Sequence, residues 1–224
     1  MILAKTGFAE QEKKTFKEST RILIRLFLVL LVIKVLYLGI TVLIDLLDKI
    51  MIPAVSNNFE VDTFSGTQKF ILTALIVPII EELTFRLGLR FSKINFLIMF
   101  SGIAYMMSKL ILQLQWYTSL CIAGMAVLLL ALVLKDQIVN RMAEFWKSNR
   151  LIVFYSLLFA FAFLHMSNYD LRVSMLPYVP FMVISHLLGG LVFSYARFKY
   201  GMVMAIGLHV LNNALFSFPL LFAS

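Results

Sequence analysis

Long apolar blocks alternate with short polar connections along the whole chain. Each block is close to the ~20 residues that an α-helix needs to cross a bilayer. The seven blocks are 22–47, 70–89, 94–112, 118–134, 151–165, 178–196 and 202–222. They are continuously apolar and lack the alternation of barrel strands, so their backbone must be satisfied within helices. We therefore predict an all-α, polytopic membrane protein with about seven transmembrane helices.

The connections between the blocks are short. Even the two longest, 48–68 and 135–150, are too small to fold as separate domains. We expect one integral-membrane domain over residues 1–224, with a polar N-terminus, a first span and an outer loop in residues 1–69. Residues 70–222 form the core that carries the motifs described below. The block 22–47 is too long for a cleaved signal peptide and is predicted to remain as a span.

Composition identifies lipid as the main solvent. Hydrophobic residues make up 61% of the chain and charged residues 14%, and the mean hydropathy is +0.92. Soluble domains are about a quarter charged, so a water-soluble fold is excluded. The net charge of +8 is scattered between the blocks, without the basic patch of a nucleic-acid site, and no nucleic-acid partner is expected. Cys121 is the only cysteine, which excludes an internal disulfide and a cysteine-based metal cluster.

Lysine and arginine are distributed unevenly between the two sides of the membrane. Fifteen of them fall in the N-terminus and the connections of one side, and three, Lys49, Lys69 and Arg172, fall on the other. Short basic connections stay in the cytoplasm. This asymmetry predicts a cytoplasmic N-terminus, an outside C-terminus and residence in the cell membrane, with membrane lipid as a constant partner.

The second block contains three charged residues, which are costly inside a bilayer and therefore candidates for function. Glu82 and Arg86 are four residues apart, so they share a helix face and can pair. Glu81 is rotated from them by about 100°, which makes it the candidate general base for a water molecule. Pro78 lacks a backbone donor and predicts a kink beside the acids. The alternative is an internally neutralised cluster that only holds helices together.

All three histidines of the chain lie in or at the edge of the late blocks. Phe161 precedes His165 by one helical turn, and Asn213 follows His209 by one turn, so each pair shares a face. A histidine beside an amide can bind a polarised carbonyl or an oxyanion. His186 has only small residues at helical spacing, and we interpret it as a packing residue.

A carboxylate, two imidazoles and a carboxamide supply the groups needed to activate water against an amide bond. His165 and His209, with Glu81, are also ligands that zinc accepts. No His-Glu-x-x-His motif occurs, and the sequence leaves zinc open. Counted at about 1.5 Å per residue from the cytoplasmic ends, Glu81 and His209 have similar depths. His165 is roughly twice as deep by the same count.

These residues form three motifs in a fixed order: Glu-Glu-x-x-x-Arg at 81–86, Phe-x-x-x-His at 161–165 and His-x-x-x-Asn at 209–213. In this order they resemble the CPBP family of intramembrane endopeptidases, also called CAAX proteases and bacteriocin-processing or Abi proteins. The family includes the type II CAAX prenyl endopeptidases. The resemblance covers residues 70–222, each motif alone is weak, and the three together are specific.

The resemblance implies that Glu81 activates the attacking water and that His165 and His209 complete the site. It further implies that Asn213 stabilises the oxyanion, with Glu82, Arg86 and Phe161 in support. The family is commonly described as metalloproteases, and a glutamate-dependent mechanism has also been argued for it. Zn²⁺ therefore stays open as a cofactor, with His165 and His209 as its candidate ligands.

The function expected from these observations is hydrolysis of a peptide bond in a membrane-associated or lipid-modified protein or peptide. One alternative, which the resemblance also allows, is a non-catalytic membrane protein that acts in bacteriocin immunity or as a scaffold. A second alternative is a proton-coupled transporter, because buried glutamate and histidine also relay protons. The absence of a visible internal repeat argues against transport.

Overall fold

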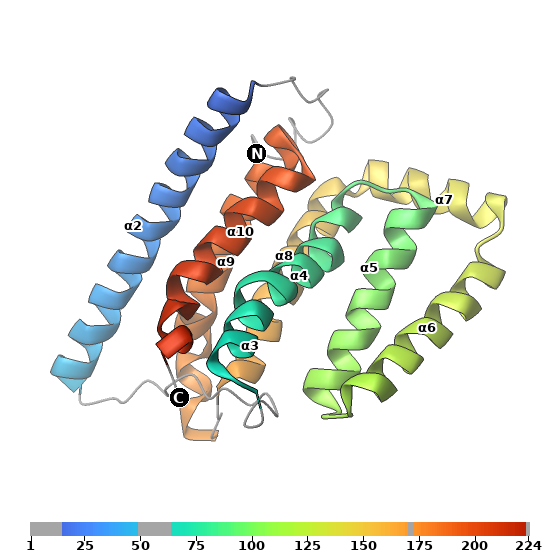
Figure 1. Ribbon diagram of the computed structural model, residues 1–224. Helices are drawn as coiled ribbons and strands as arrows, with labels where there is room; N and C mark the ends of the chain where they lie inside the picture. Colours follow the sequence, from blue (N-terminus) through green and yellow to red (C-terminus); the bar gives the residue numbers. More distant parts are fainter. Residues whose placement is uncertain (1–14, 49–63, 170–172, 223–224) are drawn as a thin grey trace. The chain divides into compact units, whose positions relative to one another are not determined.

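The computed structural model describes residues 15–48, 64–169 and 173–222, and the regular elements in these ranges are helices (Figure 1). Six of them are long and apolar enough to cross a membrane. These spans are Phe16–Ile44, Lys93–Ile111, Trp116–Val133, Arg150–Asn168, Leu176–Tyr200 and Met202–Phe222. The predicted all-α, multi-pass membrane fold is confirmed, and six of the seven predicted blocks coincide with these spans.

The remaining block, 70–89, is an interrupted helix. It consists of the end of α3 (Gly66–Ile71), a π-helix η1 (Leu72–Ile76), α4 (Val77–Phe85) and a 3₁₀ turn η2 (Leu87–Leu89). Pro78 lies at the start of α4, directly after the π-helix. The helical run from Gly66 to Phe85 carries three charged residues, Lys69, Glu81 and Glu82, and it is not among the six spans. A count of seven therefore stays a prediction.

The contacts divide the chain into two compact units, and the division falls inside two helices. Among the described residues, the unit that we call central contains Ile79–Leu157. The unit that we call flanking combines the segments that end at Pro78 with the chain from Leu158 onward. The boundaries therefore lie within α4 and within α8 (Arg150–Leu164). The expectation of a single domain over residues 1–224 stays a prediction.

In the central unit, α5 (Lys93–Met106) packs along α6 (Trp116–Val133), and the π-helix η3 (Met107–Ile111) extends α5. The predicted polar connection after α6 is a helix, α7 (Asp136–Ser148). The indole of Trp146 on α7 donates to the Gly88 carbonyl at 2.9 Å and contacts the rings of Phe91 and Phe96. Lys93 Nζ donates to the Leu134 carbonyl at 2.7 Å, which satisfies the end of α6.

In the flanking unit, α2 (Phe16–Asp48) packs against α9 (Val179–Tyr200) and α10 (Met202–Ser217), which also pack against each other (Figure 1). α10 contacts the π-helix η1, and the 3₁₀ turn η6 (Phe218–Phe222) contacts α3. Two further 3₁₀ segments, η4 (His165–Asn168) and η5 (Val173–Tyr178), pack against α9. Many apolar side chains of α2 are exposed, including Leu36 and Leu38 at 62%, as expected of a helix that faces lipid.

Candidate functional site

The central unit holds the acidic motif on α4. Arg86 Nη1 lies 3.5 Å from Glu82 Oε1, and both side chains are almost fully buried. The ion pair predicted from the four-residue spacing is therefore present. Glu81, on the neighbouring position of the helix, is also buried, with 8% of its surface exposed.

α4 and α5 approach closely beside this motif, at Thr84 and Gly102. Thr84 donates its hydroxyl to the Ile80 carbonyl at 2.7 Å, which fixes the rotamer of the side chain. A Cβ at Gly102 of α5 would collide with the Thr84 side chain. The glycine therefore allows the two helices to approach closely one turn from Glu81.

The flanking unit holds the aromatic and histidine motifs. The Phe161 ring centroid lies 4.6 Å from that of His165 and 6.1 Å from that of His209. Phe161 thus contacts both histidines, although the residue count places them at different depths. His209 is 3% exposed and stacks on Phe193 of α9, with centroids 4.2 Å apart and an interplanar angle of 19°.

One hydrogen bond sets the chemistry of His165. Its Nδ1 lies 2.8 Å from the Phe161 carbonyl oxygen, which can only accept. Nδ1 must therefore carry the proton, and in the neutral ring Nε2 keeps the lone pair. The Phe-x-x-x-His motif produces this bond because residues four apart are neighbours on a helix. His165 can thus act through Nε2 as a base, an acceptor or a ligand.

His186 lies against His165, an arrangement that the sequence did not reveal. The two imidazole rings stack with centroids 4.1 Å apart and an interplanar angle of 27°. The interpretation of His186 as a packing residue rested on its neighbours along its own helix. Its partner is on another segment, so no spacing in the sequence could have found it.

Asn213 is held by two hydrogen bonds within the flanking unit. Its Nδ2 donates to the backbone carbonyl of Thr73 at 3.2 Å, and its Oδ1 accepts from Asn212 Nδ2 at 2.9 Å. The second hydrogen on Nδ2 is the one that an oxyanion could use. Asn212 and Thr73 were not singled out from the sequence.

The predicted site residues thus fall into two sets. Glu81, Glu82 and Arg86 belong to the central unit. The other set, in the flanking unit, consists of Phe161, His165, His209 and Asn213. Phe161 lies against both histidines, whereas the hydrogen bonds of Asn213 go to Thr73 and Asn212. The meeting of these residues in one site stays a prediction.

The fit to a metal ion is partial. Nε2 of His165 suits a ligand because Nδ1 is bonded to a carbonyl, the usual arrangement for a metal-binding histidine. Within residues 15–48, 64–169 and 173–222, however, no group of three His, Cys, Asp or Glu side chains is placed to hold a metal ion. The described residues do not complete a zinc site, and no chemical step below depends on one.

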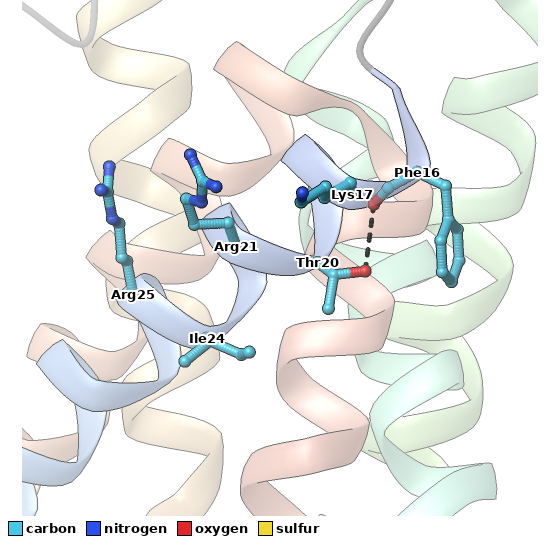
Figure 2. A pocket seen from close by; sticks show the side chains of 6 residues that line it. All are labelled: Phe16, Lys17, Thr20, Arg21, Ile24 and Arg25. Carbon is cyan, nitrogen blue, oxygen red and sulfur yellow. Dashed lines mark hydrogen bonds between the residues drawn. The ribbon is translucent and has the colours of Figure 1, made fainter.

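Two features of α2 lie outside the motifs. A shallow surface hollow at its start is lined by Lys17, Arg21 and Arg25 together with Phe16, Thr20 and Ile24 (Figure 2). The Thr20 hydroxyl donates to the Phe16 carbonyl at 3.0 Å. Further along the helix, Lys34 Nζ lies 4.2 Å from the centroid of the Phe216 ring. This contact between a cation and an aromatic ring offsets part of the cost of an intramembrane lysine.

Comparison with known proteins gives one clear relationship. A family model described as "Type II CAAX prenyl endopeptidase Rce1-like" matches residues 64–215. No curated protein and no solved structure matches the chain significantly. The matched range contains all three motifs and covers well over half of the chain. The chain therefore belongs to the Rce1-like family of type II CAAX prenyl endopeptidases.

Proposed function

We propose that the protein is an intramembrane endopeptidase that hydrolyses a peptide bond of a membrane-associated or lipid-modified protein or peptide. The observation that carries this proposal is the family match over residues 64–215, within which every motif position is filled. The multi-pass fold is consistent with it, because such an enzyme must act on a substrate at or in the membrane.

Glu81 is the general base of the proposed mechanism. It removes a proton from a water molecule, and the resulting hydroxide attacks the carbonyl carbon of the scissile bond. The burial of Glu81 supports this role. Loss of hydration disfavours the charged form of a carboxylate, so a buried carboxylate is a stronger base toward a bound water molecule. The proton then passes to the departing amine nitrogen, so the reaction consumes one water and leaves Glu81 ionised.

His165 and His209 are proposed to orient the water and the substrate carbonyl. His165 can accept a hydrogen bond at Nε2, since its Nδ1 proton is committed to Phe161. The free hydrogen on Asn213 Nδ2 is the proposed donor to the oxyanion. Glu82 and Arg86 have a structural role, because their ion pair neutralises two charges inside the protein.

The test compares membrane peptides from cells that produce the intact protein or Glu81→Gln, followed by cleavage of the candidate substrate in proteoliposomes. We expect Glu81→Gln to lower kcat by roughly 10²–10⁴-fold, and His165→Ala and His209→Ala to lose activity as well. Glu82→Gln is the matched control on the adjacent position and should retain part of the activity.

Two results would contradict the proposal. One is an unchanged cleavage rate in Glu81→Gln at equal expression. The other is a cellular phenotype that survives Glu81→Gln and has no peptide product, which would favour the non-catalytic immunity or scaffolding role. Metal content of purified wild type and His165→Ala, measured by elemental analysis, would decide separately whether zinc is part of the enzyme.

A further inference from the structure

In the helix that leads to Glu81, the backbone carbonyl of Thr73 lacks its regular helical donor. In an α-helix the Val77 N–H would bond to the Thr73 carbonyl, four residues earlier. Here the π-helix shifts this bond by one residue, and Val77 N–H bonds to the Leu72 carbonyl instead. The next residue in the π register is Pro78, which has no N–H. The backbone therefore offers Thr73 neither its α-helical nor its π-helical donor.

The donor comes from α10. Asn213 Nδ2 lies 3.2 Å from the Thr73 carbonyl oxygen, across 140 residues of sequence. The orientation of the amide is fixed by Asn212, whose Nδ2 donates to Asn213 Oδ1 at 2.9 Å. Exchanging the oxygen and nitrogen of Asn213 would place oxygen against the Thr73 carbonyl and nitrogen against the Asn212 amide, and would lose both bonds.

We propose that Asn213 is a positioning residue, which stabilises the π-helix by supplying the hydrogen bond that the π register and Pro78 remove. A backbone carbonyl without a donor is costly inside a membrane protein, where water cannot replace the missing bond. Asn213, the last residue of the His-x-x-x-Asn motif, thereby stabilises η1, the π-helix that precedes α4. α4 carries Glu81 and Glu82. This role is separate from an oxyanion donor, and it uses the other hydrogen of the same amide.

The π-helix matters to the proposed reaction because of helix geometry. One extra residue in a turn changes the direction of every later side chain by about 100°. Glu81 and Glu82 differ in direction by the same angle. The register of the π-helix therefore selects which of the two adjacent glutamates occupies a given direction. This consequence rests on the proposed function, whereas the anchoring bond does not.

The test is a double-mutant cycle with Asn213→Ala and Pro78→Ala, followed by thermal unfolding of the purified proteins in detergent. Asn213→Ala should lower Tm by about 2–6 °C, as expected for one unsatisfied buried carbonyl. Alanine at position 78 restores an N–H that can reach Thr73 in the π register. The cost of Asn213→Ala should therefore fall by at least half in the Pro78→Ala background.

Ser108→Ala is the matched control, because Ser108 also donates to a backbone carbonyl, that of Ala104 at 2.8 Å, on a helix of the other unit. Its cost should be the same with and without Pro78→Ala. If Asn213→Ala does not accumulate, recovery of expression in the double variant reports the same coupling. Costs of Asn213→Ala and Pro78→Ala that simply add would overturn the proposal.

The cycle is read from Tm and not from kcat, because Asn213→Ala also removes the proposed oxyanion donor, and Pro78→Ala cannot restore that donor. The Tm cycle needs no substrate, so it can be read even if the wild type cleaves nothing.

Discussion

At the scale of single residues, the orientation of His165 depends on contacts from two directions. The Phe161 carbonyl accepts its Nδ1 proton, and the imidazole of His186 covers one face of the ring. The hydrogen bond selects the tautomer, and the stack restricts rotation of the ring. Together they determine where Nε2 points, which is what a catalytic imidazole requires.

We therefore expect His186→Ala to lower kcat by roughly tenfold to hundredfold, because a loose imidazole spends less time in the productive orientation. His186→Phe should keep most of the activity, since an aromatic ring of similar size restores the stack. KM should change little in both variants. Steady-state kinetics on the substrate identified by the peptide comparison would measure kcat and KM.

Phe181→Ala is a suitable control for this prediction. Phe181 also lies on α9 and stacks on Tyr37, with centroids 4.9 Å apart. The substitution Phe181→Ala removes this aromatic pair and leaves the His165–His186 stack in place. An equal fall in kcat for Phe181→Ala and His186→Ala would mean that both act only by loosening the fold.

Residues close in sequence were predictable, and residues brought together by folding were not. The Glu82–Arg86 ion pair follows from a four-residue spacing on one helix, and it is present. The His165–His186 stack and the Asn213–Thr73 bond join distant segments. Spacing along a helix carries no information on such contacts, which depend on how the helices pack.

At the scale of helices, the fit between α4 and α5 depends on Gly102. The Thr84 side chain occupies the space that any larger residue at 102 would need, and its hydroxyl is held by Ile80. Gly102→Ala should lower the free energy of unfolding by about 1–3 kcal/mol through overpacking. Thermal unfolding in detergent would measure the change.

Gly124→Ala is the matched control for this prediction. Gly124 lies on α6 in the same unit, and a Cβ there would meet no atom within 4 Å. Alanine should be neutral at this position, or stabilising by up to about 1 kcal/mol, because it restricts the unfolded chain and favours the helix. Equal effects at Gly102 and Gly124 would show that the close contact with Thr84 is not what limits the residue at 102.

Hydropathy predicted the helices well because a span needs a fixed length of apolar sequence, and six blocks satisfy that length. The block at 70–89 differs from the six in composition, because it contains Glu81, Glu82 and Arg86. Pro78 predicts a kink beside the acids, and that kink stays a prediction. The π-helix that precedes α4 could not be inferred from the sequence. The hydrogen-bond register of a backbone depends on available donors, such as Asn213, and is not recorded in hydropathy.

At the scale of the whole molecule, we expect the orientation in the membrane to depend on the basic residues at the start of α2. This helix has 33 residues, about 50 Å at 1.5 Å each, whereas the hydrocarbon core is about 30 Å thick. Lys17, Arg21 and Arg25 lie within its first ten residues and are exposed on its surface (Figure 2). A helix of this length can keep all three in the headgroup layer while its apolar part spans the core.

We predict that the N-terminus is cytoplasmic and that these three cations contribute to that orientation through the positive-inside effect. In a Cys121→Ser background, a cysteine added at the C-terminus should react with an impermeant reagent in intact cells. One added at the N-terminus should react only after permeabilisation.

Replacing Lys17, Arg21 and Arg25 with glutamine should raise the fraction of inverted molecules, because the first span usually dominates topology. Lys69→Gln, on the predicted outer side, should not. A C-terminal cysteine that is protected in intact cells of the wild type would contradict the predicted orientation.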